Sequence, residues 1–141
     1  MRIGRCAISD LSITAASVLL VSGPVGNAVA GVAITAGMVI YIDATGLMQK
    51  AKNDTLAHAA ATGIALGAAG IGQWATYAKA GARVTIGATV VPGACFSVSS
   101  NAGGVQPEAD MATGYYITQI GRAPNTTDVV LEMNQYGYVH A

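Results

Sequence analysis

The sequence predicts an all-β protein: a small β-barrel or sandwich built from two related halves, with an extended N-terminal arm and at most one or two short helical turns. Apolar runs rich in β-branched residues recur about every 8 to 12 residues, separated by the Gly, Asn and Asp residues that favour turns. A frame of glycines is also repeated along the chain. The length of 141 residues suits one domain.

The repeated frame occurs at residues 31–46 and again at residues 87–104. In each copy a Gly is followed three residues later by a β-branched residue, and three residues later by a second Gly, before an apolar run that ends in a turn. An offset of 56 residues superposes the copies and places Cys95 on Val39. Two copies are too few for a solenoid, which needs at least three stacked units. A single closed or sandwiched domain is therefore expected.

The repeat divides the chain into an arm of residues 1–25 and a barrel-like domain of residues 26–141, whose related halves cover residues 28–80 and 84–134. Glycine tolerates the positive φ angles of tight bends, so we expect structural glycines at equivalent bends in both halves. Side chains alternate along a strand, so Val39 and Cys95 should both face inward. The predicted structural glycines are Gly31, Gly37, Gly87 and Gly93.

Strands and turns follow from local composition. Hairpin turns are expected at residues 44–46 and 100–104. The only convincing helical stretch runs from Asp54, which can cap it, to Ala61, and residues 107–112 resemble a second, shorter turn. The expected strands of the halves are 38–42, 64–66 and 74–77, then 94–98, 115–120 and 129–131.

The composition indicates a protein that covers much of its surface with partners. Charged residues make up 10% of the chain, where about 25% is usual in soluble domains. Hydrophobic residues make up 52%, and we expect association with copies of itself or with another protein. The alternative is a monomer with a surface of Ser, Thr, Asn and Gly. The net charge is zero without a basic cluster, so nucleic acid is not an expected partner.

The N-terminal segment has some features of a secretory signal: Arg2, Arg5, the apolar run 15–21 and a small-residue site at 28–30. Asp10 and the Gly-Pro pair that follows the run oppose this interpretation, as does the loss of the first residues of the repeat on cleavage. The apolar run is too short to span a membrane. We therefore expect an extended arm.

The arm is the predicted partner-binding segment. Residues 11–14 alternate apolar and polar side chains, as a half-buried strand does, and an extended segment can pair with the exposed sheet edge of a neighbour. The alternative is an arm that folds back as a strand of its own barrel. The expected binding residues are the anchors Ile3, Ile8, Leu11 and Ile13, with Arg2 and Arg5 pairing with acidic groups of the partner.

Residues that could perform chemistry are better explained structurally. Cys95 matches Val39 as a small core residue, and two cysteines without a motif, Cys6 and Cys95, establish neither a disulfide nor a metal site. Neither His58 nor His140 has a carboxylate or thiol at ligand spacing. Glu108 and Asp110 suit a solvated turn rather than an acid and base pair. The sequence thus predicts no catalytic residue, cofactor or metal.

Two further features are explained by structure rather than by ligand binding. The Gly-rich segment 67–72 lacks the order of phosphate-binding motifs and connects two expected strands, which indicates a flexible hairpin connection. Trp74, the single Trp, begins a strand and is expected in the core or an interface rather than on a sugar-stacking platform.

The repeated frame resembles that of the small capsid cement, or head decoration, proteins of tailed bacteriophages. The resemblance covers residues 26–134 and rests on the segments 36–43, 63–66, 91–98, 116–123 and 128–133. It implies a β-barrel-like domain that forms a homo-oligomer, often a trimer, on the outside of an icosahedral head and clamps neighbouring major capsid proteins. It implies localisation on the virion after synthesis in the host cytoplasm. The family brings no catalytic residues, and residues 94 and 1–25 depart from its pattern.

Two other functions remain open. A carbohydrate-binding β module would group aromatic side chains on one exposed face, around Trp74, Tyr115, Tyr116, Tyr136 and Tyr138. A phage tail or baseplate structural protein would share the same composition. An enzyme is the class that the sequence favours least.

Overall fold

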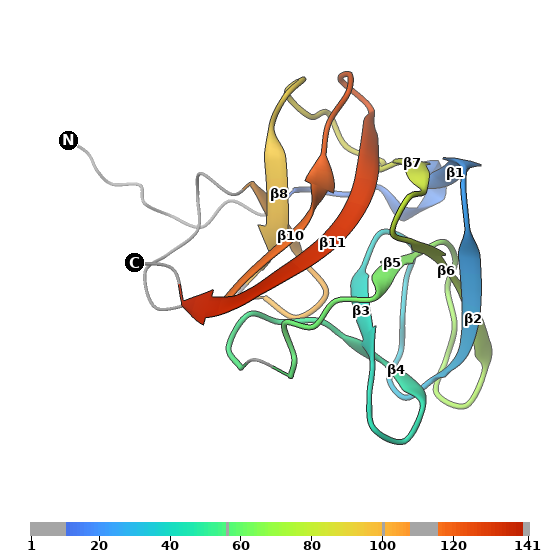
Figure 1. The fold of residues 1–141 in the computed structure, drawn as a ribbon. Coiled ribbons are helices and arrows are strands. Elements are labelled where there is room, and N and C mark those ends of the chain that lie inside the picture. Colours follow the sequence, from blue (N-terminus) through green and yellow to red (C-terminus); the bar gives the residue numbers. More distant parts are fainter. Residues whose placement is uncertain (1–10, 56, 100, 108–115, 140–141) are drawn as a thin grey trace.

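A computed structural model describes residues 11–55, 57–99, 101–107 and 116–139, and these residues form an all-β protein with one 3-10 turn, η2 (Figure 1). The predicted fold class is confirmed. The strands form a closed barrel and a six-stranded sheet that packs beside it. The elements are η2 (Ala15–Ser17), β1 (Leu19–Ser22), β2 (Val25–Ala30), β3 (Val39–Ile42), β4 (Leu47–Lys50), β5 (Gly63–Ala65), β6 (Trp74–Lys79), β7 (Arg83–Thr85), β8 (Cys95–Val98), β9 (Val105–Pro107), β10 (Tyr116–Arg122) and β11 (Asp128–Val139).

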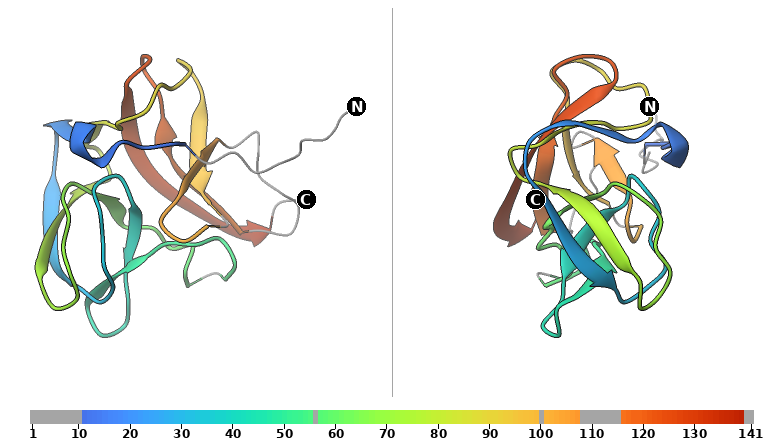
Figure 2. Two further views of the ribbon diagram at one scale, coloured as in Figure 1. Left: turned by 180° about the vertical axis from the view of Figure 1, so that it is seen from behind. Right: turned by 90° about the vertical axis from the view of Figure 1, so that its right-hand side faces the viewer.

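The barrel is built from the first half of the chain. Its strands follow the order β2-β4-β3-β5-β6, and β6 pairs with β2 to close the ring. All of its pairs are antiparallel except β2 with β4, which is parallel. Figure 2 shows the barrel strands wrapped around one another below the sheet. β-Branched residues dominate β3, and the turn at residues 43–46 joins it to β4, as predicted.

The sheet is built from the second half and the arm. Its order is β1-β7-β11-β10-β8-β9, and every pair is antiparallel. The order β9-β8-β10-β11-β7 repeats the barrel order β4-β3-β5-β6-β2, strand for strand. The parallel pair that closes the barrel, β2 with β4, has no counterpart between β7 and β9 in the described part of the chain. The second half is therefore an opened version of the first.

The arm occupies the open side of the second half. Leu11 N donates to Val105 O on β9 over 2.8 Å, and Thr14 N donates to Gly87 O, also over 2.8 Å. The chain then forms β1, which pairs with β7. Residues 11–22 thus run from one edge strand of the repeated unit to the other. In the barrel, β2 and β4 pair with each other. In the second half the corresponding strands, β7 and β9, instead form hydrogen bonds with residues 11–22.

Two of the predicted glycines make the same turn in the two halves. Gly37 has φ 91° and donates its N–H to Ala65 O, whereas Gly93 has φ 86° and donates to Ala123 O, each over 2.8 Å. Both φ angles lie in the left-handed region that favours glycine. Each turn also directs the chain into the strand that follows, β3 or β8.

Gly31 and Gly87 both lie at bends, as expected, and each follows the corresponding strand, β2 or β7. Their backbone conformations differ. Gly87 has φ 78°, but Gly31 is absent from the residues with positive φ that the structure describes. At Gly31 a Cβ would displace the side-chain amide of Gln49, which donates to Asp43. At Gly87 a Cβ would lie 2.6 Å from the carbonyl oxygen of Thr14, so this glycine admits the arm.

Two hydrophobic cores organise the molecule. One fills the barrel and includes Ile40, Met48 and Tyr77. The other lies between the barrel and the sheet, where Val39 and Ile64 of the barrel meet Phe96 and residues of β7, β10 and β11. Strands β3 and β5 are therefore buried on both faces, which explains their continuous apolar sequences. Val39 is fully buried as expected, but Cys95 is only half-buried.

The predicted helix at residues 54–61 is wrong. In its described residues, 54–55 and 57–61, the segment forms turns and a bend, with one α-helical hydrogen bond from Ala59 N to Thr55 O over 3.0 Å and one 3-10 bond from Ala60 N to Ala57 O over 3.3 Å. Asn53 anchors the segment on β8, because its N–H donates to Ser99 O and its side chain donates to Val98 O. At the other end Thr62 N donates to Ile40 O on β3 over 2.8 Å, so both ends of the segment are attached to strands. The second expected turn, residues 107–112, lies largely outside the described residues.

Candidate functional site

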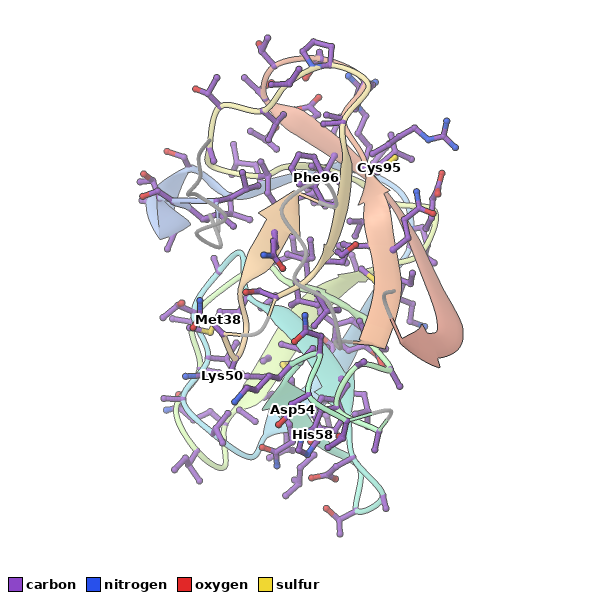
Figure 3. All side chains as sticks on the ribbon, turned by 90° about the vertical axis from the view of Figure 1, so that its left-hand side faces the viewer. Met38, Lys50, Asp54, His58, Cys95 and Phe96 are labelled. Carbon is purple, nitrogen blue, oxygen red and sulfur yellow. The ribbon has the colours of Figure 1, made fainter. Side chains whose placement is uncertain are left out.

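A polar pocket of about 360 Å³ lies beside the barrel, where the first and second halves meet. Strands β3 and β4 supply part of its wall, and the loop after β4 supplies most of the charged groups. Figure 3 shows Lys50, Asp54 and His58 close to one another, away from Cys95 and Phe96 on β8. The lining residues are Val32, Tyr41, Gln49, Lys50, Lys52, Asp54, His58 and Ala102.

An Asp and His pair lies at the centre of the charged groups. His58 Nδ1 is 2.9 Å from Asp54 Oδ1, and Lys52 Nζ is 3.9 Å from Asp54 Oδ2. The hydrogen bond from His58 is the main reason that the pKa of Asp54 is lowered, with smaller effects from the charges of His58 and Lys52. Asp54 is therefore an ionised carboxylate at neutral pH whose two oxygens both have cationic or N–H partners.

Tyr41 connects this pair to the barrel. Its ring centroid lies 5.7 Å from that of His58, with the planes tilted by 35°. Burial raises the pKa of Tyr41, and the negative charges of Asp43 and Asp54 raise it further. The phenol therefore keeps its proton and can donate a hydrogen bond.

The turn before β4 holds a second carboxylate. Asp43 accepts hydrogen bonds from the hydroxyl and N–H of Thr45, from the N–H of Leu47 and from the side chain of Gln49. The bond from the Thr45 hydroxyl is the largest of the effects that lower the pKa of Asp43 to about 2. Because all its oxygens accept hydrogen bonds, Asp43 fixes the turn and orients Gln49 at the pocket wall.

The pairing of Asp54 with His58 was missed by the sequence analysis. The two residues are four apart, which is a recognisable spacing for a side-chain pair in a helical turn. From the sequence, Asp54 was expected to cap a helix and His58 had no expected partner. The loop geometry instead turns both side chains toward each other. In the described part of the chain no group of three His, Cys, Asp or Glu side chains could hold a metal ion.

Two of the predicted partner-binding residues can be placed. Leu11 and Ile13 are half-buried against the core between the barrel and the sheet, and Ile13 packs over Gly37 and Gly87. For residues 11–22 the expected contact with a neighbour is replaced by contact with the protein's own fold, since β1 is a strand of its own sheet. The other predicted residues, Arg2, Ile3, Arg5 and Ile8, lie outside the described residues.

Among the described residues, large apolar side chains are exposed in three places. The arm contributes β1, where Leu19, Leu20 and Val21 are all exposed at the edge of the sheet, and Val25 follows on β2. Trp74 is 72% exposed, and Ile71 precedes it in the connection between β5 and β6. Val91 is exposed before β8. Trp74 is therefore not a core residue, in contrast to one of the two structural roles expected for it.

The remaining candidate residues have structural explanations or lie elsewhere. Cys95 is a free thiol on β8. The Gly-rich segment 67–72 connects the antiparallel strands β5 and β6, as predicted. Cys6, His140, Glu108 and Asp110 fall outside the described residues, as do Tyr115 and the side chains of the other three expected aromatics near the C-terminus. Within the described ranges no helix is long and apolar enough to cross a membrane.

No protein-family model matches the chain, and no curated protein matches it either.

Proposed function

We propose that this protein is a structural virion protein, a capsid cement or decoration protein that binds the outside of an icosahedral phage head. It stabilises contacts between major capsid proteins and has no enzymatic activity. The resemblance of its repeated glycine frame to that of cement proteins suggests the class. The observation that carries the proposal is the uncharged, apolar strand β1 at the open edge of the sheet.

Strand β1 has the properties of a docking element. Leu19 is 62% exposed and Val21 is 52% exposed, although they belong to a strand of the sheet. An edge strand has backbone donors and acceptors on its free side, and native proteins usually protect such edges with charge. The sequence of β1, Leu-Leu-Val-Ser, contains no charge. A partner strand can therefore add to this edge with main-chain hydrogen bonds, while the apolar side chains give further affinity.

The same surface supports self-association. The chain has seven basic and seven acidic residues, so charge repulsion between copies is weak. We propose a homo-oligomer, a trimer as the resemblance implies, that forms free in solution or on the shell. Sedimentation measures the mass of the free and shell-bound protein. A monomer in both states, with no contact above about 800 Å² in total, would contradict self-association.

Binding to shells is tested by co-sedimentation with assembled heads of the major capsid protein. We expect the protein to pellet with the heads at a fixed ratio to the major capsid protein. Leu19→Lys should prevent binding, because a charge on β1 opposes strand addition, whereas Val91→Lys, on the exposed loop before β8, is the matched control. The proposal is contradicted if the protein stays in the supernatant in the presence of heads. It is also contradicted if Leu19→Lys and Val91→Lys reduce binding to heads equally.

One observation favours a second candidate, a carbohydrate-binding β module. Trp74 is largely exposed at the start of β6, and an exposed indole can stack on a sugar ring. Binding to a panel of polysaccharides that Trp74→Ala abolishes would support this function. A tail or baseplate protein would instead co-purify with tails and be absent from isolated heads.

A further inference from the structure

We propose that the polar pocket beside the barrel binds an acidic segment of a partner protein through a carboxylate side chain. The pocket is distinct from strand β1. In the context of the proposed function the partner is the shell protein, so this inference rests on that function only for the identity of the partner. The carboxylate chemistry follows from the pocket itself.

The acidic groups at the pocket already have partners. Asp54 accepts from His58 and lies beside Lys52, and Asp43, just outside, accepts from Thr45, Leu47 and Gln49. Neither carboxylate has an oxygen without a neighbouring donor or cation. A cationic ligand would therefore compete with His58 and Lys52 for Asp54.

The donors of the pocket, in contrast, have capacity left. Across the described residues the side chain of Lys50 forms no hydrogen bond or ion pair, although Lys50 lines the pocket and is half-buried. Lys52 touches Asp54 only at 3.9 Å, which leaves N–H donors of its ammonium group available. The phenol of Tyr41 adds a neutral donor. A ligand with acceptor oxygens and negative charge satisfies these groups.

The charge and shape favour a carboxylate over a phosphate. Two lysines and one aspartate give the lining a formal charge of +1 when His58 is neutral, which matches one carboxylate rather than a dianion. Among the lining residues there is no arginine to form the bidentate contacts that phosphates favour. Val32, Ala102 and the ring of Tyr41 provide apolar surface for the methylene groups of a glutamate.

The openness of the pocket favours a peptide over a small free molecule. The side chains of Lys52, Asp54 and His58 remain 41%, 37% and 45% exposed. Pockets for small ligands generally enclose about 70 to 90% of the ligand surface. A wide site with exposed walls suits a side chain presented by a larger body, whose backbone passes over the rim.

The test uses a labelled peptide, acetyl-Gly-Glu-Glu-Gly-amide, and fluorescence anisotropy with the full chain at low salt. We expect saturable binding, and no binding of the matched peptide with Gln in place of Glu. Lys50→Met and Lys52→Met should each weaken binding about tenfold, the effect of one charge-assisted hydrogen bond. Methionine retains the aliphatic stem, and thermal unfolding shows whether each variant is folded. Lys79→Met, on β6 outside the pocket lining, is the control and should bind as the wild type does.

Several results would overturn the inference. They are binding of the Gln peptide with equal affinity, equal weakening by Lys79→Met, or displacement of the peptide by inorganic phosphate at lower concentration than by acetate. The last result would assign the pocket to a phosphate group. Co-sedimentation of the Lys50 and Lys52 variants with heads separates the two proposals. If the wild type binds heads and the Lys50 and Lys52 variants do not, the pocket is supported as a contact with the shell. If all of them bind heads equally, that role of the pocket is overturned while the cement function stands. Peptide binding without any head binding supports the pocket and contradicts the cement function.

Discussion

Gly63 on β5 and Gly121 on β10 hold the same position in the two halves of the fold. Gly63 faces Ile40 on β3, and Gly121 faces Phe96, the counterpart of Ile40 in the repeat. A Cβ on either glycine would overlap the carbonyl oxygen of the next strand, at Ala78 or Val130. The two halves therefore share a close backbone approach that only glycine permits.

We expect Gly63→Ala and Gly121→Ala each to lower the free energy of unfolding by about 2 to 3 kcal/mol, because an atom is forced against a neighbouring strand. Urea unfolding measures the change. Gly67→Ala is the matched control, since a Cβ at Gly67 meets nothing within 4 Å. Equal stability of the Gly63 and Gly67 variants would contradict the close approach.

Removal of residues 1–22 should destabilise the domain. The deletion removes β1, which pairs with β7. It also removes Val18, which is buried, and Ile13, and so exposes the core residues that these two side chains cover. We expect a lower thermal transition, and Val18→Ala in the intact chain should lower the free energy of unfolding by about 1 to 2 kcal/mol. Ser17→Ala, at an exposed neighbour, should change it by less than about 0.5 kcal/mol. An unchanged transition after deletion would mean that the arm is dispensable to its own fold.

The turn at Asp43 should add stability that depends on pH. The pKa of Asp43 is lowered from 3.8 to about 2 in the folded protein, chiefly by the Thr45 hydroxyl, so folding favours the ionised form. The stabilisation is complete above about pH 4 and is lost as the pH falls through about 2. The stability difference between the wild type and Asp43→Asn should therefore be constant near neutral pH and shrink toward pH 2. Urea unfolding across this range measures it, and a constant difference would contradict the assignment.

Asp128 should be the most important carboxylate for stability in the sheet. It is buried and accepts hydrogen bonds from Arg83 and Thr85 over 2.9 Å each. Burial raises its pKa, but hydrogen bonds from Thr85, Arg83 and neighbouring side chains outweigh this effect and lower it. Asp128→Ala leaves these donors without their acceptor, and we expect the free energy of unfolding to fall by about 2 to 3 kcal/mol.

Glu132→Ala is the control for Asp128. Glu132 pairs with Arg122 over 3.0 Å, but the arginine side chain is 61% exposed, so solvent screens the pair. The loss should be below about 1 kcal/mol. Denaturant unfolding of both variants compares them directly, and a larger effect at Glu132 would reverse the expected order.

The local sequence determined the strands and the turns. Alternating and β-branched runs specify strands through side-chain packing on a pleated surface, so β3, β6 and β8 were predicted to within a few residues. The turns at Gly37 and Gly93 were predictable because a positive φ is a local requirement that glycine meets. The repeated frame also indicated two related halves, which the common strand order of barrel and sheet displays.

The tertiary structure decided how these elements meet. The constant offset of 56 residues places Gly121 on Ala65, whereas the strand register matches it with Gly63, because register depends on contacts between segments distant in sequence. The strands of the first half close into a barrel, whereas those of the second half form an open sheet with the arm strand β1 at its edge. The sequence of the arm does not decide this, because a segment of alternating residues can pair with its own sheet or with the sheet of another molecule. The bond between Asp54 and His58 likewise needs a loop held at both ends by strands. Local composition favoured a helix there, but the anchoring of Asn53 to β8 selected the turn.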